Sequence, residues 1–261
     1  MKDKGKTNSK SFDIKLPLEF ISSMPTGIAK EAVEILGRRI ADDVYSPDEI
    51  MPTEPELAES LGVSRATVRD AIKVLSGMGL VRTARRYGTR VRPVEEWNLL
   101  DSDLVGWHDL NHPRIKRMFS ETTELRTIIE PAAAALAAER ATEVQIQKIE
   151  EAAHAIHHGK GDLQALFDAD CQFHITLLDA TQNNVIHQMR QIILTMLRIS
   201  YEFGVIVGNA DEVNSEAHIL VASAIKNRQP DKARDLMTKM LERNQEIAVN
   251  YWVKMDETTK Q

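Results

Sequence analysis

The order of apolar and polar positions between residues 26 and 76 predicts three short helices, because apolar residues recur there every three or four positions. The first helix follows Thr26, and its apolar face is formed by Ile28, Ala32, Ile35, Leu36 and Ile40. The second follows Thr53, which forms a capping-box pattern with Glu56, and it ends at Gly62. We expect the first helix to pack behind the other two.

The third helix, which follows Ser64, separates apolar from basic residues most clearly. Its buried stripe is formed by Val68, Ala71, Ile72 and Leu75. Arg65, Arg69 and Lys73 therefore share the solvent-facing side. A short helix that presents two arginines four residues apart suits the major groove of DNA, because arginine can bond guanine edges or phosphate.

Beyond Gly79 the pattern changes from helical to alternating, which predicts two strands. Apolar and basic residues alternate over residues 80–83 and again over 89–92, so each strand has one buried face. Residues 85–88, with the sequence Arg-Arg-Tyr-Gly, then form the tip of a hairpin.

The positive charge of this region sets it apart from the rest of the chain. Between residues 62 and 93 there are eight arginine or lysine residues and one acid, Asp70, whereas the whole chain has a formal net charge of −6. Concentrated positive charge repels itself and is typical of a surface that binds a polyanion. A solvated basic face without a ligand is the alternative. We therefore predict that residues 24–93 form a DNA-binding domain.

Residues 113–254 show helical periodicity and no convincing strand. Turn-forming residues separate about six predicted helices, at 113–138, 142–158, 162–180, 184–206, 211–228 and 230–252. From residue 94 onward the chain has 17 basic and 26 acidic residues, so a second DNA-binding surface is not expected there. The predicted fold class is mainly α, with an N-terminal winged helix-turn-helix domain and a C-terminal all-α helical bundle.

Three further segments complete the predicted organisation. Residues 1–23 contain too few apolar residues to offset the entropy of ordering them, and we expect a flexible arm. Residues 94–112 form a connector with two tryptophans, Trp97 and Trp107, which is too apolar for a free linker. We expect the connector to pack against one or both domains, either as a route of communication or as a static brace. Residues 255–261 are predicted to be a tail.

The composition indicates a globular protein in a reducing compartment. A chain of 261 residues with 43% hydrophobic and 28% charged residues can form two independent cores. The single cysteine, Cys171, excludes an intramolecular disulfide. No apolar run approaches the ~20 residues of a membrane span, and no apolar signal core follows the lysine-rich start. We predict a cytoplasmic protein with no membrane partner.

The segment P-T-E-x-E-L-A-E-x-L-G-V-S-R-A-T-V-R-D-A-I at residues 52–72, followed by G-L-V and G-T-x-V, resembles the winged helix-turn-helix of the GntR family of bacterial transcription regulators. The resemblance covers about residues 26–93. It departs at Pro55, where relatives often have an arginine that helps to bind DNA. The predicted DNA-binding residues are Thr53, Glu54, Ser64, Arg65, Thr67, Arg69, Arg85, Arg86 and Gly88.

Two pairs of residues in the C-terminal half are candidates for metal binding. Asp170 and His174 lie four residues apart, so a helix would place both on one face, where they could share a divalent metal or bond each other. His154 and His158 have the same spacing, but they precede Gly159 at a predicted helix C-terminus. The helix dipole favours imidazolium there without any metal, and we prefer that interpretation.

The segment around 124–130, the pair Asp170 and His174, and His218 resemble the helical ligand-binding (FCD) domain of the FadR subgroup of this family. The connector is similar to that of the subgroup's sugar-acid regulators. The resemblance implies a divalent metal, such as zinc, nickel or manganese, on Asp170, His174 and His218. It departs at Met240, where relatives with a full site have another histidine, and a thioether is a poor ligand for hard cations. We expect water or an effector oxygen to complete the site.

Arg126 lies among apolar residues of a predicted helix and therefore needs an anion. Glu130, four residues on, can supply one, and the resemblance implies that the carboxylate of an effector binds there as well. Arg198 and Tyr201 could face the same pocket. These two residues and Arg126 are the predicted effector-binding residues.

The sequence therefore predicts a DNA-binding repressor that is released by a small carboxylic, sugar-acid-like effector. We expect a homodimer that reads an inverted-repeat operator. The alternative is a metal-dependent hydrolase with an appended DNA-binding module, in which Asp170, His174 and His218 would be catalytic. No obvious general base and no nucleophile motif such as G-x-S-x-G accompany them, so we predict that the protein is not an enzyme.

Overall fold

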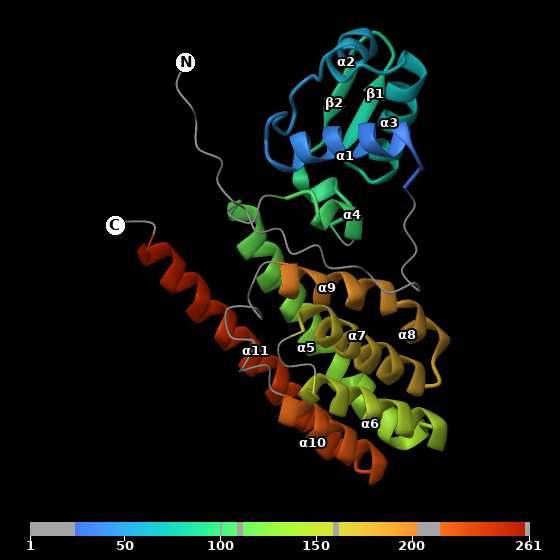
Figure 1. The fold of residues 1–261 in the computed structure, drawn as a ribbon, viewed down its shortest axis with the longest axis vertical. Helices are drawn as coiled ribbons and strands as arrows, with labels where there is room; N and C mark the ends of the chain where they lie inside the picture. Colours follow the sequence, from blue (N-terminus) through green and yellow to red (C-terminus); the bar gives the residue numbers. More distant parts are fainter. Residues whose placement is uncertain (1–23, 100, 109–111, 159–161, 203–214, 259–261) are drawn as a thin grey trace.

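The computed structural model describes residues 24–258 apart from 100, 109–111, 159–161 and 203–214. Within that part of the chain, buried hydrophobic residues form two separate cores, one in an N-terminal domain and one in a helical domain. Figure 1 shows the two domains at opposite ends of the molecule, with the short helix α4 (Ser102–Val105) between them. The predicted fold class is confirmed.

The N-terminal domain has the predicted order of elements. These are α1 (Ile28–Ala41), α2 (Glu54–Leu61), α3 (Arg65–Gly77), β1 (Val81–Ala84) and β2 (Gly88–Val91). Val33, Leu36 and Ile40 form the core side of α1 and are fully buried. Ile28 and Ile35, which the sequence pattern placed on this face, are instead 62% and 42% exposed. Successive helical residues point about 100° apart, so Ile35 turns away from the face that contains Leu36.

The two strands form an antiparallel hairpin that carries the wing. Val81 pairs with Val91, and the register runs to Gly88 at the tip. Each strand is displaced by one residue from its predicted position. One further residue, Ile50, forms an isolated bridge to Arg90 at the sheet edge, which the sequence pattern did not indicate.

The connector packs into the core of the N-terminal domain. It contains the 3-10 helix η1 (Val94–Glu96) and α4, and its two tryptophans, Trp97 and Trp107, are buried in that core. A Cβ added to Gly37 of α1 would lie 2.4 Å from the Trp107 ring, so the ring occupies space that a larger residue at position 37 would fill. The expectation that the connector packs against a domain is therefore met.

The helical domain is built on α5 and α11, which lie along each other, while α6 packs against both α7 and α10 (Figure 1). Its helices are α5 (Pro113–Arg140), α6 (Glu143–His158), α7 (Leu163–Ala180), α8 (Asn184–Gln188), α9 (Arg190–Glu202), α10 (Ser215–Lys226) and α11 (Pro230–Thr258). The single helix predicted at 184–206 is wrong, because the chain turns at Met189, whose N–H bonds the carbonyl of Ile186. The predicted helical positions 203–206 and 211–214 lie outside the described residues.

A group of polar contacts joins the two domains at the start of α5. Arg114 donates from Nη1 to the carbonyl of Ala41 at 2.7 Å and from Nη2 to Asp43 Oδ1 at 2.9 Å. His112 Nδ1 accepts from the backbone N–H of Arg114, so Nε2 carries the proton and donates to Asp43 Oδ2 at 3.0 Å. The guanidinium of Arg114 also lies 4.9 Å from the ring centre of Trp97.

The connector meets the helical domain at α9. A Cβ on Gly106, which follows α4, would lie 2.6 Å from Nη2 of Arg198, so the glycine lets this side chain approach the connector backbone. In the described part of the chain, no helix combines the length and hydropathy needed to cross a membrane.

Candidate functional site

The predicted DNA-binding helix, α3, exposes its N-terminus and its basic face. Ser64 caps the helix, because its Oγ accepts from the backbone N–H of Thr67 at 3.1 Å and lies 2.9 Å from the Thr67 hydroxyl. Arg65 and Arg69 are exposed, while Val68 between them is fully buried. The structure thus places these four polar residues together at one end of the domain, as the helical pattern predicted.

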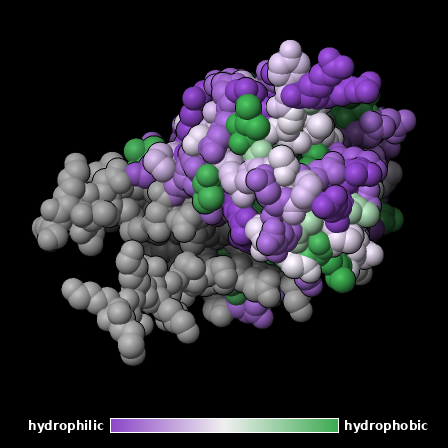
Figure 2. Space-filling model, turned by 90° about the horizontal axis from the view of Figure 1, so that it is seen from above, coloured by the Kyte–Doolittle hydropathy of each residue, from purple (hydrophilic) through white to green (hydrophobic). Residues whose placement is uncertain are grey.

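The wing places its basic residues at an exposed hairpin tip. Arg85 and Arg86 are exposed, and Tyr87 is 77% exposed. Arg86 and Gly88 have φ values of 71° and 79°, so the chain reverses through two left-handed residues. Figure 2 looks down on this end of the molecule, where the described surface is mainly hydrophilic and hydrophobic residues form separate small spots.

Thr53 and Glu54 begin α2 beside the recognition helix. Glu56 Oε2 accepts from both the N–H and the hydroxyl of Thr53 at 2.7 Å, as expected for the predicted capping box. Glu54 bonds the guanidinium of Arg69 on α3. Thr53 therefore fixes the helix start, and Glu54 reaches the basic face.

A buried donor set lies in the helical domain, where α7 meets α10. Asp170 and His174 of α7 and His218 of α10 each offer one atom, and these atoms lie within 4.8 Å of one another. Asp170 Oδ1 is 3.4 Å from His174 Nε2 and 3.2 Å from His218 Nε2. All three side chains are buried, so the three residues predicted as metal ligands are brought together.

The spacing of these atoms fits a metal ion better than hydrogen bonds. Asp170 Oδ1 has no hydrogen-bond partner in the described structure, so neither of its two contacts with the histidines has the geometry of a hydrogen bond. Two bonds of about 2.1 Å that meet at about 100–110° place their ligand atoms about 3.2–3.4 Å apart, which matches the observed separations. Met240 is buried in the same core, and among the described residues only these three form a convergent metal-binding group.

Two charged side chains of α5, Glu130 and Arg126, lie beside His174. Glu130 Oε2 lies 2.6 Å from His174 Nδ1, an arrangement that leaves Nε2 directed to the other ligands. Arg126 donates to Glu130 Oε1 at 2.5 Å, and its Nη2 lies 3.2 Å from His174 Nε2. The predicted pairing of Arg126 with Glu130 is present, but the contact of Glu130 with His174 was not predicted.

Electrostatics keep both buried carboxylates ionised. Burial alone would raise the pKa of Glu130, but the charges of Arg126 and His174 outweigh burial and lower this pKa to about 2. Burial likewise opposes ionisation of Asp170, but the imidazoles of His174 and His218 hold its pKa well below its usual range. Burial would lower the pKa of His174, but Glu130 and Asp170 outweigh burial and raise it to about 9, so His174 is protonated at neutral pH. The positive charges of His174 and Arg126 therefore balance the negative charges of Glu130 and Asp170 inside an apolar core.

Tyr201 and Arg198, the other predicted effector-binding residues, both belong to α9, but their side chains lie in different surroundings. Tyr201 is fully buried with its ring 5.0 Å from that of Phe167, and its hydroxyl has no hydrogen-bond partner in the described structure. Burial and the charge of Asp170 raise the pKa of Tyr201 above its usual value, so the phenol is neutral. Arg198 is half-buried and approaches Gly106 of the connector.

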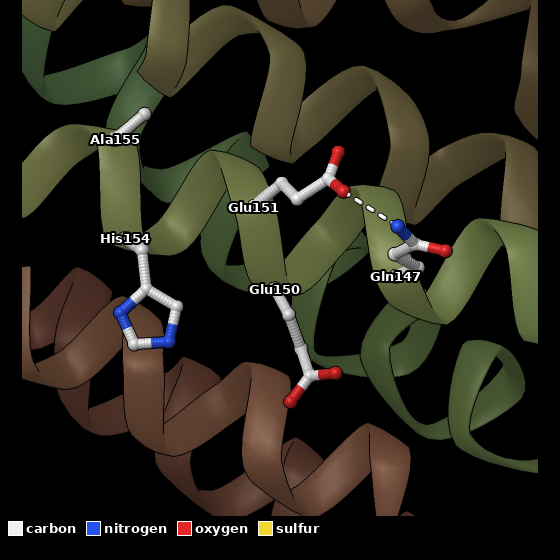
Figure 3. A pocket seen from close by; sticks show the side chains of 5 residues that line it. All are labelled: Gln147, Glu150, Glu151, His154 and Ala155. Carbon is white, nitrogen blue, oxygen red and sulfur yellow. Dashed lines mark hydrogen bonds between the residues drawn. The ribbon is translucent and has the colours of Figure 1, made fainter.

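The rival histidine, His154, lies on the surface. Figure 3 shows it extending from α6 on the same side as Glu150, at an open hollow of about 580 Å³ that Gln147, Glu151 and Ala155 also line. Gln147 bonds Glu151 at 2.7 Å, and Glu150 bonds Lys226 at 2.9 Å. The side chain of the predicted partner, His158, lies outside the described residues. The hollow is distinct from the buried donor set.

Two family profiles match the chain in the same order as its domains. The profile "Bacterial regulatory proteins, gntR family" matches residues 28–91, and the profile "FCD domain" matches residues 121–243. The first covers the helix-turn-helix and wing, and the second covers the helices that contain the buried cluster.

Curated relatives extend the similarity over most of the chain. The galactonate operon transcriptional repressor of Escherichia coli (strain K12) is 30% identical over 210 residues, which are 79% of this chain and 90% of that protein. The Uxu operon regulator of Haemophilus influenzae is 26% identical over 217 residues, which are 80% of this chain and 77% of that protein.

A solved structure supports the fold alone. Lar, described as controlling the expression of the Listeria monocytogenes agr system, has a TM-score of 0.64 and 20% identity, with coverage of 87% of this chain and 98% of Lar. The named relatives are regulators, which is consistent with the prediction that the protein is not an enzyme, and the hydrolase alternative has no support here.

Proposed function

Since the chain belongs to the GntR family of bacterial transcription regulators and carries an FCD domain, we propose that it is a homodimeric repressor released from its operator by a small sugar acid. The observation that carries this proposal is the buried cluster of Asp170, His174 and His218 beside Arg126. An ionised donor set of this kind next to a buried cation is suited to an oxygen-rich anion.

Operator binding is assigned to α3 and the wing. Arg65 and Arg69 enter the major groove, Ser64 and Thr67 contact phosphate or base edges at the helix N-terminus, and the wing tip contacts the neighbouring backbone. Replacing Arg69 with alanine is expected to weaken operator binding about 5- to 150-fold, and replacing a phosphate-binding arginine lowers the salt slope by about 1. Titration of a labelled operator duplex with protein at several salt concentrations measures the operator affinity and the salt slope. Unchanged affinity in both arginine variants would exclude this face.

The homodimer follows from the size of the operator contact. One recognition helix reads only a few base pairs, so specificity against a genome takes two half-sites related by the two-fold axis of the protein. We assign the dimer interface to the helical domain. Light scattering of the free protein and footprinting on an operator test this assignment, and a monomer-sized footprint at saturation contradicts it.

The charge of the buried cluster favours a metal and an anion together. Metal binding requires neutral imidazoles, and the set then has a charge of −1, because Arg126 contributes one positive charge and Glu130 and Asp170 contribute two negative charges. A divalent cation changes this charge to +1, and the carboxylate of a monoanionic effector brings it to zero. Buried charge is costly unless compensated, so the two ligands are expected to stabilise each other.

The effector would contact both the metal site and the surrounding polar residues. Asp170, His174 and His218 would hold the metal, which supplies a Lewis-acidic centre for an effector oxygen. Arg126 binds the carboxylate, and the Tyr201 hydroxyl, which lacks a partner in the described structure, donates to a second oxygen. Arg198 remains a further predicted contact. The Escherichia coli relative is named for galactonate, a sugar acid with the required carboxylate and hydroxyls.

Metal analysis and thermal shift test the ligand site directly. We expect purified protein to melt at a lower temperature after treatment with a chelator and to recover with zinc, nickel or manganese. A sugar acid is then expected to raise the melting temperature further only in the metal-loaded protein. Absence of metal, together with no response to any of these ions, would exclude the metal site.

Release from DNA tests the regulatory role of the same residues. The double variant His174→Ala and His218→Ala is expected to bind the operator normally and to resist release by the effector. Gln147→Ala, in the open hollow, is the control and should leave both properties unchanged. Release of the double variant at the wild-type effector concentration would place the effector pocket elsewhere.

A further inference from the structure

Glu54 and Arg69 form an ion pair that connects the first residue of α2 to the basic face of α3. Arg69 Nη2 lies 3.0 Å from Glu54 Oε2, and Arg69 Nε lies 3.3 Å from Oε2 and 3.4 Å from Oε1. The two residues are 15 positions apart and lie on different helices, so the contact depends on how the helices pack.

The carboxylate uses only one edge of the guanidinium. Arginine has five N–H donors, and Glu54 engages the edge formed by Nε and Nη2. The end of the guanidinium, formed by Nη1 and the second N–H of Nη2, bonds no other acceptor within the described ranges. This end has the fork geometry that pairs with O6 and N7 of guanine.

We infer that Glu54 is a positioning residue, which presents the end of Arg69 to a guanine and sets sequence discrimination rather than overall affinity. This inference rests on the proposed DNA-binding function. A carboxylate close to DNA repels phosphate, so Glu54 should not increase affinity for DNA in general. Its benefit is that Arg69 enters the groove with its orientation fixed, which lowers the entropy lost when the base contact forms.

The environment of Glu54 supports a fixed orientation. The capping contacts of Thr53 and Glu56 hold the start of α2, and Pro55 restricts the backbone directly after Glu54. Arg65, one turn before Arg69, has no such carboxylate partner among the described residues. The basic face of α3 thus combines an exposed arginine, Arg65, with one that a carboxylate orients, Arg69.

The experiment compares specific and non-specific binding in matched variants. Full-length wild-type protein first selects duplexes from a random pool, and each base pair of the selected site is then substituted to find the guanine read by Arg69. Affinities for the selected and substituted duplexes are measured for wild type, Glu54→Ala and Glu54→Gln. Glu59→Ala is the control, because it removes the same charge from the exposed side of the same helix.

Wild-type protein is expected to bind the selected duplex about 5- to 150-fold more tightly than the duplex substituted at that base pair, and this ratio measures discrimination. Glu54→Ala should lower this ratio at least about threefold while its affinity for the substituted duplex is retained or increased, and Glu54→Gln should fall between. Glu59→Ala should retain the wild-type ratio. In an Arg69→Ala background, Glu54→Ala should have no further effect on the ratio.

Some results would contradict the positioning role of Glu54 alone, and a different result would also contradict the proposed operator binding. If wild type selects a site but Glu54→Ala keeps the full ratio, or Glu59→Ala changes it equally, Glu54 does not position Arg69. If folded wild-type protein selects no preferred sequence, the proposed operator binding fails as well. Melting curves of all variants establish that they are folded, which is expected because Glu54 and Glu59 lie outside the core.

Discussion

Arg69 and Arg126 each bond a glutamate, one on the surface of the DNA-binding domain and the other inside the helical domain. The side chains of Arg69 and Glu54 are 59% and 32% exposed, whereas those of Arg126 and Glu130 are 7% and 1% exposed. The surface pair joins two helices, and the buried pair spans one turn of α5.

The difference shows how burial decides what an ion pair can do. Water competes for both members of an exposed pair, so the pair contributes little to folding, and the end of the guanidinium that the carboxylate does not engage stays open to a ligand. In the buried pair each charge depends on the other, and removing one leaves a desolvated charge without compensation. The first pair is suited to recognition, and the second is suited to a site where an incoming anion must share an existing network.

The largest expected effect comes from breaking the buried pair. Glu130→Ala removes the acceptor of Arg126 and the carboxylate 2.6 Å from His174 Nδ1, and we expect it to lower the free energy of unfolding by about 3–5 kcal/mol. Denaturation in urea measures this change. Glu121→Ala, which breaks the exposed pair with Arg117 on the same helix, is the control and should have no measurable effect. A loss below about 1 kcal/mol for Glu130→Ala would contradict our reading of burial.

A second prediction concerns the connector, which separates the two environments. Gly37→Ala places a methyl group against the Trp107 ring, and we expect a loss of about 3 kcal/mol, since overpacking forces the ring or backbone to move. Urea denaturation followed by tryptophan fluorescence measures this loss. Gly77→Ala is the matched control, because its Cβ meets nothing within 4 Å, and it should stabilise α3 slightly. Equal effects at the two positions would show that Trp107 does not lock the connector to α1.

His108 provides a third environment, a buried polar group that forms no ion pair within the described residues. Its Nε2 has no hydrogen-bond partner in the described structure, and burial lowers its pKa from 6.5 to about 4. The folded state thus binds the proton less readily than the unfolded state, so stability is complete above pH 6.5 and falls as the pH decreases toward 4. The contribution of His108 to the loss between pH 7 and pH 5 is expected to be about 2 kcal/mol.

Substituting His108 tests this pH dependence. Urea denaturation at pH 7 and pH 5 should show the loss in wild type, and His108→Phe should remove it. His154→Phe, at an exposed histidine, should retain it. An equal loss in wild type and His108→Phe would assign the acid sensitivity to other groups, among which Asp43, His112 and Arg114 lie nearest.

The smallest expected effect is on the surface pair. Glu54→Ala should leave the free energy of unfolding at pH 7 unchanged within error, because water replaces the carboxylate around Arg69. Urea denaturation of Glu54→Ala and Glu130→Ala under the same conditions compares their changes in the free energy of unfolding. A clear loss for Glu54→Ala would mean that this pair supports the packing of α2 on α3, and the contrast between the two pairs would weaken.

Local signals in the sequence predict the DNA-binding domain well because they agree with one another. Thr53 and Ser64 cap the helices as expected, and Gly62 ends α2 with a left-handed φ of 66°. The bridge at Ile50 was not predicted, since a single residue has no period. Ile35 was placed on the wrong face because apolar character alone does not define the centre of a helical stripe.

The buried cluster is predictable only in part. Spacing on one helix placed Asp170 beside His174, whereas His218 entered through family resemblance, because no local rule states which helices become neighbours. The contact of Glu130 with His174 joins α5 to α7 and left no signal in either segment. The DNA-binding and effector-binding roles of these residues stay predictions until the variants are measured.

The contacts at the start of α5 have a mechanical consequence. Arg114, which bonds Ala41 and Asp43 at the end of α1, and Arg126, in the buried cluster, belong to one continuous helix and are separated by about 18 Å at 1.5 Å per residue. A rotation of this segment by about 5° about Arg126 displaces Arg114 by about 1.6 Å, enough to take a hydrogen bond from about 2.9 Å to beyond its useful range. The helix therefore acts as a lever arm, and angular changes too small to disturb the packing around Arg126 are converted into the making or breaking of a bond to α1.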